Sequence, residues 1–433
     1  MKKNTILKIA TLLLASTVLL AAPSHTQAKS KNSGKVRKGI TWSYSAAKDT
    51  LTIKGKGAVT TDDLKLATKN SWPVSGNSSI PKFHKIVFGN GITKIDIAFF
   101  SIEGIKSITL PKSLTSITTR SDFYNLNGDY DPWNTTLTKI KVAAKNKKFR
   151  ARNNILYSKN GKTLVVYPGG KIATKFKVPS KVTKIAPYAF YGTDIGTITM
   201  GNKVTTIGNN AFENCTLKKV TLSKKLKKIG ASAFVETALT TVSLPTTLTS
   251  IGSSAFSGCN LTQVVLPKNV TSIGGSAFSK NTALSSIQIN SSCEIATSVF
   301  RNCSKVYDEK SGYMVYHKVQ VHLGQKMTAP IDNLIDGLEK VIYFTVDANN
   351  TKYYAKDGCL YTKRGDTLLY TPELSKYNTG TDNNTSQSTT QPNTNSTSDT
   401  GNTSETDNTP TTTGDTSDTG NTAGTDDTAK AAA

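Results

Sequence analysis

The chain has few of the residues on which catalysis and metal binding most often depend. It has four histidines, one of which, His25, lies in the segment expected to be removed on export. His317 and His322 are five residues apart, which is not a metal-ligand spacing and would place them on opposite faces of a strand. No convergent set of acid, base and nucleophile is visible. The sequence therefore predicts a protein with no enzymatic activity, no metal and no cofactor.

Long apolar runs are also missing, apart from one near the start of the chain. Lys2 and Lys3 precede an apolar stretch over residues 9–22, and Thr26-Gln27-Ala28 follows as a small-residue cleavage site. A span of 14 residues is short for a membrane helix, which needs about 20. This pattern predicts a secretory signal peptide over residues 1–28, cleaved after Ala28, and a secreted or cell-surface protein with no transmembrane segment in the mature chain.

The last 55 residues have no aromatic side chain and no Val, Ile, Leu, Phe or Met. Residues 379–433 are rich in Thr, Ser, Asn, Asp and Gly, so they cannot bury enough apolar surface to offset their chain entropy. We expect a disordered tail that serves as a spacer, with an inert tail as the alternative. No LPxTG motif and no terminal apolar segment occurs, so covalent anchoring to a cell wall is not expected.

Acidic residues are scarce in the region between these two ends. The chain has 54 Lys and Arg against 29 Asp and Glu. Because residues 1–28 contribute +3 and residues 379–433 contribute −7, residues 29–378 carry a net charge of +29. Such a field favours anionic partners in general but does not choose among them.

Against these absences, one positive feature dominates the sequence, a strict period of 22 residues. Two apolar columns keep this period over six successive copies, and these are Ile185, Ile207, Ile229, Ile251, Ile273 and Ile295, followed by Phe190, Phe212, Phe234, Phe256, Phe278 and Phe300. A fixed period in this range is the signature of a solenoid, in which neighbouring coils bury each other's apolar faces. The sequence therefore predicts one continuous core and places any function on a surface.

The copy over residues 239–256 predicts the layout of one coil. Leu239, Val242 and Leu244 fit the inner side of a strand, and Pro245 ends it. Gly252 follows the column Ile, which suits a tight turn with positive φ. Ala255-Phe256 then closes the coil in a short helical or 3₁₀ turn.

The five cysteines predict buried thiols more than disulfides. Cys215, Cys259 and Cys303 are 44 residues apart, which is two coils and about 9–10 Å across stacked strands. A disulfide needs Cα atoms within about 7 Å. Cys293 and Cys359 stay unassigned, and the odd total leaves at least one thiol unpaired within the chain.

Three segments outside the regular copies read as β-hairpins, and the one over residues 39–59 is expected to cover the first coil. They lie over residues 39–59, 149–168 and 353–372, the second and third resembling each other and turning at Lys159-Asn160-Gly161 and Lys363-Arg364-Gly365. A short helix is expected over residues 332–340. Between Ile117 and Ile185 the spacing is 46 residues too long, which indicates an insertion.

The pattern LxxVxLPxxLTxIGxxAFxxC, the segment TLTIxGxGA with Trp72-Pro73 downstream, and the hairpin ILYSKNGKTLVVYP resemble the BspA-like leucine-rich repeat family. The resemblance covers about residues 39–372. Two departures affect edge coils, since Phe123 lies six residues after Ile117 and Val299 replaces the small residue before Phe300. It implies an exported, surface-displayed protein of a family that includes adhesins, and it carries over no catalytic or ligand-binding residue.

The predicted fold is thus a β-rich leucine-rich repeat solenoid, a right-handed α/β-type superhelix with short helical or 3₁₀ turns, β-hairpin caps and a disordered C-terminal tail. The expected organisation is a signal peptide (1–28), an N-terminal cap (29–90), a solenoid (91–304) with an inserted hairpin segment at about 123–178, a C-terminal cap (305–378) and the tail (379–433).

Two exposed sets of side chains are the candidate sites. An outward array at strand positions is expected to bind an extracellular protein or glycan, as an adhesin would, and comprises Lys218, Lys219, Thr240, Thr241, Ser243, Thr262, Gln263, Ser285, Ser286 and Gln288. A lysine belt at the following turns is expected to contact anionic polymer, and comprises Lys203, Lys224, Lys225, Lys227, Lys228 and Lys268.

Each set also has a plainer interpretation. Thr and Ser suit exposed strand positions without any ligand, and lysines keep stacked strands soluble. Retention on the producer's own envelope through the lysine belt is the alternative function, and a non-catalytic module of a longer anchored protein is a second alternative. A monomer is expected, and nucleic acid is not expected as a partner.

Overall fold

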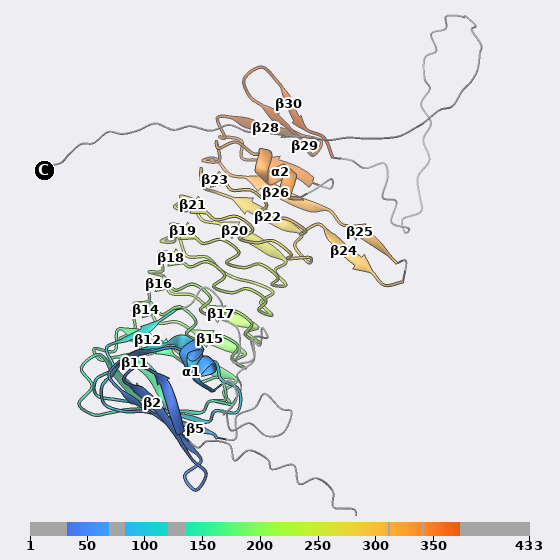
Figure 1. The fold of residues 1–433 in the computed structure, drawn as a ribbon. Helices are drawn as coiled ribbons and strands as arrows, with labels where there is room; N and C mark the ends of the chain where they lie inside the picture. The colour runs from blue at the N-terminus through green and yellow to red at the C-terminus, as the bar shows by residue number, and fades with distance from the viewer. Residues whose placement is uncertain (1–32, 69–82, 120–135, 311, 339–341, 373–433) are drawn as a thin grey trace, which may run out of the picture. The chain divides into compact units, whose positions relative to one another are not determined.

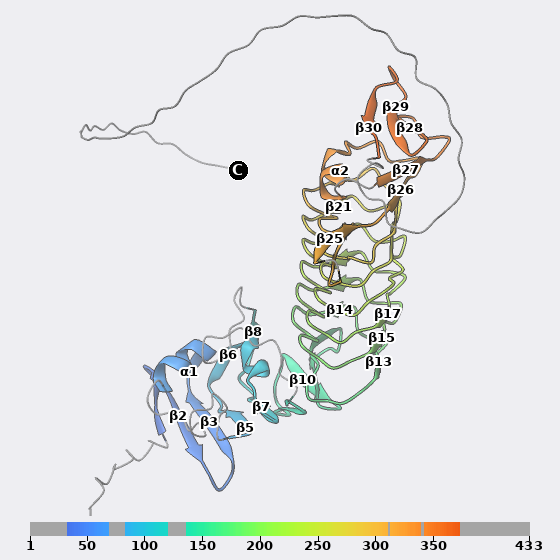
Figure 2. The same ribbon diagram turned by 90° about the vertical axis from the view of Figure 1, so that its right-hand side faces the viewer.

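The computed structural model describes residues 33–68, 83–119, 136–310, 312–338 and 342–372. The chain divides into two units, Met1–Asn378 and Thr379–Ala433, and all described residues belong to the first. The predicted signal peptide and tail lie outside the described residues. Within the first unit the coils stack one on another from β14 (Lys184–Ile185) to β23 (Glu294–Ile295), as the solenoid predicted from the 22-residue period requires (Figures 1 and 2).

The N-terminal part begins with the predicted hairpin and continues as stacked coils. One sheet has the order β1-β2-β3-β5-β7-β9, in which β1 to β3 pair antiparallel and the later pairs are parallel. Its strands are β1 (Ser33–Arg37), β2 (Ile40–Ser45), β3 (Thr50–Gly55), β5 (Lys85–Phe88), β7 (Ser107–Leu110) and β9 (Lys139–Val142). A second, parallel sheet contains β4 (Gly57–Val59), β6 (Ile92–Asp96) and β8 (Ser116–Thr118). The helix α1 (Thr61–Thr68) and the 3₁₀ helix η1 (Ile97–Ser101) complete this part.

The predicted column of isoleucines forms a continuous parallel ladder in the central coils. Each column Ile pairs with the next in register, for example Ile229 with Ile251, and the residue before it pairs likewise. The sheet has the order β10-β11-β12-β14-β16-β18-β19-β21-β23. Its strands are β10 (Phe149–Arg152), β11 (Ile155–Ser158), β12 (Thr163–Val166), β14 (Lys184–Ile185), β16 (Thr206–Ile207), β18 (Lys228–Ile229), β19 (Ser250–Ile251), β21 (Ser272–Ile273) and β23 (Glu294–Ile295).

The second side of each coil carries the longer strands that precede the turns. These form two separate sheets, β13-β15-β17 and β20-β22-β26-β27. The strands are β13 (Lys175–Lys177), β15 (Thr197–Thr199), β17 (Lys219–Thr221), β20 (Gln263–Leu266), β22 (Ser286–Ile289), β26 (Val319–Leu323) and β27 (Ile342–Val346). The strand predicted for residues 239–244 is wrong, because this stretch pairs with neither neighbour as a strand.

The predicted column of phenylalanines forms the centre of the core. All six side chains, from Phe190 to Phe300, are fully buried. Successive rings stack with centroids 4.9–5.5 Å apart and planes within 20° of parallel. The backbone of the same stretch joins the coils, since the Phe256 N–H donates to the Ala277 carbonyl at 2.7 Å, and Phe190, Phe212, Phe234 and Phe278 make the equivalent bond to the next coil. The closing turn is a run of hydrogen-bonded turns in these coils and not a helix.

Glycine follows four of the column isoleucines because the backbone of the neighbouring coil approaches closely there. The positive φ that the sequence predicted at these glycines is wrong. A Cβ on Gly252 would lie 2.4 Å from the Ala231 nitrogen, and the equivalent glycines meet the same obstruction at 2.3–2.5 Å. The positive φ instead falls two residues later, on Asn210, Ser232, Ser254, Ser276 and Ser298, at 52–59°. Asn and Ser occupy a conformation that glycine would adopt more easily.

The hairpin at 149–168 separates two hydrophobic cores. Ile155, Tyr157 and Leu164 pack into the core of the central coils, while Leu156 and Val166, on the other face, pack into the N-terminal core. The similar hairpin near the C-terminus contains β28 (Tyr353–Lys356), β29 (Cys359–Thr362) and β30 (Leu368–Tyr370), and it covers the last coil with Tyr353 and Leu360. Both therefore serve as caps.

Two further elements interrupt the last coils. The predicted short helix is α2 (Asp332–Leu338). A two-stranded arm, β24 (Lys305–Asp308) and β25 (Tyr313–Tyr316), projects from the stack and was not predicted (Figure 1). Its base is closed by a backbone bond from the His317 N–H to the Ser304 carbonyl at 2.8 Å.

Substitution of the glycine column should test the packing limit between coils. Gly252→Ala is expected to destabilise the protein by about 1–3 kcal/mol, because the added methyl group forces adjacent coils apart. Gly201→Ala is the matched control, since its Cβ would meet nothing closer than 3.6 Å and its φ is not positive. The control should be neutral or more stable by about 0.4–1 kcal/mol. Urea denaturation of both variants checks this, and equal midpoints would contradict it.

Candidate functional site

The ten residues of the outward array point away from the core. Eight are exposed, and Ser286 and Gln288 are half-buried. Pairing places some of them side by side, since Gln263 lies opposite Ser286 across the parallel pair β20 and β22. Lys219 pairs with Thr197 in the other sheet. The array is therefore carried by stacked coils, with neighbouring coils about 4.8 Å apart.

A seam divides this array into two panels. In other coils the backbone joins across this side, as when the Ser285 N–H donates to the Thr262 carbonyl at 3.0 Å. Among the described residues, no backbone bond joins residues 218–222 to residues 240–244. Thr240, Thr241 and Ser243 are exposed as predicted, but they lie on an unpaired stretch and not on a strand. The seam therefore leaves the two coils without backbone bonds between them at the centre of the candidate site.

The structure extends the second panel with residues that the sequence did not identify. Gln320 pairs with Ser286 and His322 with Gln288, and β27 adds Tyr343 and Thr345 in the same rows. The His322 ring nitrogen Nδ1 and the Thr345 hydroxyl are 3.0 Å apart. The arm hides this continuation, because residues 305–316 lengthen one coil and move the next strand out of the 22-residue period. If residues 305–316 are left out of the count, Gln320 and His322 follow Ser286 and Gln288 at the 22-residue period.

All six residues of the lysine belt are exposed. Lys203 and Lys225 occupy the same position in successive coils, and Lys228 lies in the ladder between Thr206 and Ser250. Within the described ranges, no carboxylate forms an ion pair with a belt lysine. Like charges stacked at strand spacing repel each other. The belt is thus a region of uncompensated positive charge.

Three of the five cysteines belong to a buried column of polar residues, to which each coil contributes one residue. The column contains Thr193, Cys215, Thr237, Cys259, Asn281 and Cys303. Cys215, Cys259 and Cys303 each donate to the carbonyl of the phenylalanine 25 residues earlier, at 2.8–3.1 Å, and Asn281 bonds the Phe256 carbonyl at 2.8 Å in the same way. The prediction of buried thiols at these three positions is confirmed, since all five cysteines are free and these three are buried. The side chains of this column therefore act as hydrogen-bond donors to backbone carbonyls inside the core.

Burial makes these thiols poor nucleophiles. It raises the pKa of Cys215 to about 12, that of Cys259 to about 11 and that of Cys303 to about 12. The thiolate is the reactive form, and at neutral pH it is scarcely populated at such pKa values. Burial also raises the pKa of Cys293. Cys359, on β29, is half-buried.

The described residues offer neither a metal site nor a helix that could span a membrane. Within the part of the chain that the structure describes, no three His, Cys, Asp or Glu side chains gather closely enough to hold a metal ion. None of the described helices has the length and apolar character needed to cross a bilayer. His317 has a structural partner, the Leu284 carbonyl, 2.9 Å from its Nε2.

Comparison with known families identifies the repeat. The model of the BspA type leucine rich repeat region matches this chain in six copies, over residues 77–154, 170–280 and 227–310. These ranges include the Ile and Phe columns and part of the N-terminal coils. No curated protein matches the chain in sequence.

Several solved structures are similar to the chain at low identity. The pneumococcal vaccine antigen PcpA is 14% identical, over 74% of this chain and 90% of its own, with a TM-score of 0.31. The T. pallidum leucine-rich repeat protein TpLRR is 23% identical, over 48% of this chain and 89% of its own, with a TM-score of 0.32. A leucine-rich cell surface protein from Faecalibacterium prausnitzii is 17% identical, over 62% and 92%, with a TM-score of 0.30.

The seam should be visible in amide hydrogen exchange. Amides of residues 241–244 are expected to exchange about tenfold or more faster than those of Ile287–Ile289, which lie in β22 between two paired strands. Exchange followed by mass spectrometry of peptides covers both stretches in one experiment. Equal protection would show that the ladder is continuous in solution.

Thiol labelling should separate the buried column from Cys359. N-ethylmaleimide at neutral pH is expected to add to the native mature chain once, at Cys359, and to all five cysteines in denaturant. Intact mass and peptide mapping give the count and the position. Rapid native labelling of Cys215, Cys259 or Cys303 would contradict the burial of the column.

Proposed function

Since the chain belongs to the BspA-type leucine-rich repeat family, we propose that it is an exported, non-enzymatic binding protein of the cell surface, adhesin-like in function. The predicted signal peptide over residues 1–28 supports export. The ligand would be an extracellular protein or glycan of a host or another microbe, bound by the outward array. No cofactor takes part.

The observation that carries this proposal is the second panel of the array, on β20, β22, β26 and β27. Hydroxyl and amide side chains stand there in paired rows, such as Gln263, Ser286 and Gln320. The buried Phe stack and the inward residues of these strands hold the rows in place, so little side-chain ordering is left for binding to supply. Rows of donors and acceptors at strand spacing suit hydrogen bonding to an extended protein backbone or to sugar hydroxyls.

A triple substitution tests the panel directly. Gln263→Ala, Ser286→Ala and Gln288→Ala together should weaken binding of the mature chain to immobilised matrix protein, mucin or partner cells by about tenfold or more, since each lost hydrogen bond contributes about 0.5–1.5 kcal/mol. Thr206→Ala with Ser250→Ala, in the other ladder, is the control and should bind normally. Absence of binding by the unaltered protein to any such surface would contradict the adhesin-like function itself.

The lysine belt supports a second candidate function, retention on the producer's own envelope by anionic polymer. Lys203 and Lys225 occupy the same position in successive coils, and no described carboxylate forms an ion pair with a belt lysine, so an external polyanion would relieve repulsion between like charges there. The net charge of +29 over residues 29–378 adds long-range attraction to such a polymer.

Retention through the belt should depend on these lysines and on salt. Cells that display the protein are expected to release it at about 0.5–1 M salt, because the Debye screening length then falls toward about 3 Å. The variant with Lys224, Lys225, Lys227 and Lys228 changed to Gln should be released at lower salt. Quantitative immunoblotting of the wash fractions measures this.

The matched control removes four charges elsewhere, with Lys141, Lys145, Lys147 and Lys148 changed to Gln, all of them exposed. It should behave as the unaltered protein does. If both variants shift equally, total charge and not the belt governs retention, and if neither is released by salt, ionic retention is wrong.

A further inference from the structure

Strands β10–β12 (the inner hairpin) and β28–β30 (the end hairpin) pair in the same way, residue for residue. Both shift register at the same point, after Leu156 in the inner hairpin and after Leu360 in the end hairpin. Each is fastened to the coil before it by an asparagine, Asn146 or Asn350, whose side-chain amide donates to two backbone carbonyls of that coil at 2.8–3.0 Å. The two hairpins can therefore be compared position by position.

The inner hairpin carries the next coil on its strand edge and on its outer face, the face that points away from the preceding coil. Strand β12 pairs parallel with β14, so that Leu164 lies opposite Ile185. The carbonyls of Lys162 and Leu164 accept bonds from backbone N–H groups of that coil at 2.7–3.1 Å. The coil covers the outer face, since Tyr157 is 5% exposed and Leu164 is 0% exposed.

The corresponding edge of the end hairpin, on β30, is unpaired. Strand β30 pairs with β29 alone. The Thr367 carbonyl accepts from the Thr362 N–H at 2.9 Å, so the alternation of an antiparallel strand turns the backbone groups of Leu368 outward. Among the described residues, no backbone N–H outside the hairpin bonds to the carbonyl of Asp366 or Leu368, the two positions at which the inner hairpin holds its coil.

The outer face of the end hairpin is exposed where that of the inner hairpin is buried. Paired residues point to the same face of a sheet, so Tyr354, Tyr361 and Leu368 form one row across the three strands. The two tyrosine rings stack with centroids 5.0 Å apart, and Leu368 at the end of the row is 51% exposed. The end hairpin therefore presents an apolar row and an open strand edge side by side.

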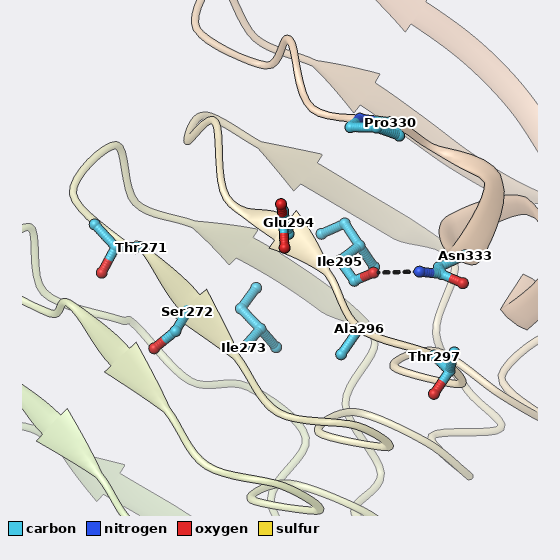
Figure 3. Close-up of a pocket in the computed structure, with 9 residues that line it drawn as sticks. All are labelled: Thr271, Ser272, Ile273, Glu294, Ile295, Ala296, Thr297, Pro330 and Asn333. Atoms are coloured by element: carbon cyan, nitrogen blue, oxygen red, sulfur yellow. Dashed lines mark hydrogen bonds between the residues drawn. The ribbon is translucent and has the colours of Figure 1, made fainter.

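The end of the Ile ladder and the first coil are both covered by the chain itself. At β23 the segment with Pro330 and Asn333 lies beside the strand, and the Asn333 amide donates to the Ile295 carbonyl at 2.8 Å (Figure 3). At the N-terminal end β2 and β3 cover the first coil, with Trp42 and Ile53 buried. Among its described residues, a second copy of this chain therefore has no uncovered coil to offer the end hairpin.

The residues that follow the two hairpins differ in what they can bury. The coil that covers the inner hairpin brings Ile185 and Phe190 into the core, both of them fully buried. Residues 373–433 contain no Ile, no Val and no Phe. These residues therefore cannot supply an equivalent coil to the end hairpin.

We propose that the outer face of the end hairpin, together with the edge of β30, binds a leucine-rich repeat coil of a partner protein whose first strand is left uncovered. The partner strand runs parallel to β30 and presents a polar residue followed by isoleucine, as Lys184-Ile185 does on the inner hairpin. The polar residue lies opposite Thr367 and the isoleucine opposite Leu368. The contact joins two solenoids end to end, because the partner's stack continues where this one stops.

The site is separate from the outward array and from the lysine belt, so it does not rest on either proposed function. Strand β30 belongs to a sheet of its own with β28 and β29, whereas the array and the belt are carried by the coils. A panel variant that abolishes adhesion should keep this contact, and a hairpin variant that abolishes the contact should keep adhesion and retention.

The probe is a labelled peptide that copies residues 181–192, Lys-Val-Thr-Lys-Ile-Ala-Pro-Tyr-Ala-Phe-Tyr-Gly, the segment that the inner hairpin holds. Fluorescence anisotropy with the full mature chain at about 0.15 M salt is expected to show saturable binding with a Kd below about 1 mM. A second peptide with Asp in place of the isoleucine should bind about tenfold or more weakly, because it loses the apolar side chain that lies opposite Leu368.

Two substitutions on β30 test the face and the register. Leu368→Asp should weaken binding about tenfold or more with an unchanged urea midpoint, because the side chain is exposed in the free protein. Thr367→Glu should strengthen binding about twofold to fivefold, because the second lysine of the peptide lies opposite it, and a loss of folding could not produce this gain. Thr351→Glu makes the same change in net charge at an exposed residue before β28 and should leave the affinity unchanged.

Three results would overturn the proposal. The first is no saturable binding of the peptide up to about 1 mM, the weakest affinity that such a contact could usefully have. The second is an equal change in affinity for Thr367→Glu and Thr351→Glu, which would place the peptide elsewhere on the molecule. The third is a dimer of the unaltered chain in sedimentation velocity that Leu368→Asp disperses, because a second copy would then occupy the face.

Discussion

In-register stacking of coils about 5 Å apart is the constraint on which the rest of the structure depends. The six phenylalanines set that spacing inside the core, with rings 4.9–5.5 Å apart. The same spacing accounts for glycine after four of the column isoleucines, because a Cβ at Gly208, Gly230, Gly252 or Gly274 would lie 2.3–2.5 Å from the neighbouring coil. It also brings each thiol of the polar column to the carbonyl of the previous coil. Each column of residues therefore accommodates the same spacing between coils in a different way.

Departures from that spacing create the features that a partner could use. The unpaired stretch at 240–244 opens the backbone on one side while the Phe stack and the Ile ladder stay continuous behind it. The arm at 305–316 leaves the coil and returns to it across one backbone bond. The end hairpin closes the stack and leaves the edge of β30 unpaired among the described residues. A regular solenoid tolerates these local interruptions because each coil is stabilised by its neighbours on several sides.

The sequence predicted those parts of the fold that repeat and failed where the repeat is interrupted. The Ile and Phe columns and the buried Cys215 follow from spacing alone, since stacking forces equal positions into equal environments. The strand expected at 239–244 has the same pattern as its neighbours, so its missing pairing depends on geometry between coils that no single copy encodes. The panel residues Gln320 and His322 were missed because the arm displaced the period.

The φ of Gly252 was also predicted wrongly, for a reason that applies to the candidate site as well. A glycine marks either a positive φ or a close approach, and one sequence cannot distinguish the two. Similarly, an exposed Thr or Lys fits either a solvated face or a ligand contact. What the structure adds is the set of residues that surround each side chain. Those surroundings differ between the two sets, since the panel residues form paired rows across neighbouring strands whereas the belt lysines have no acidic partner among the described residues. This difference in charge compensation is the physical ground on which we propose the belt as a contact for polyanions and the panel as a contact for neutral ligands.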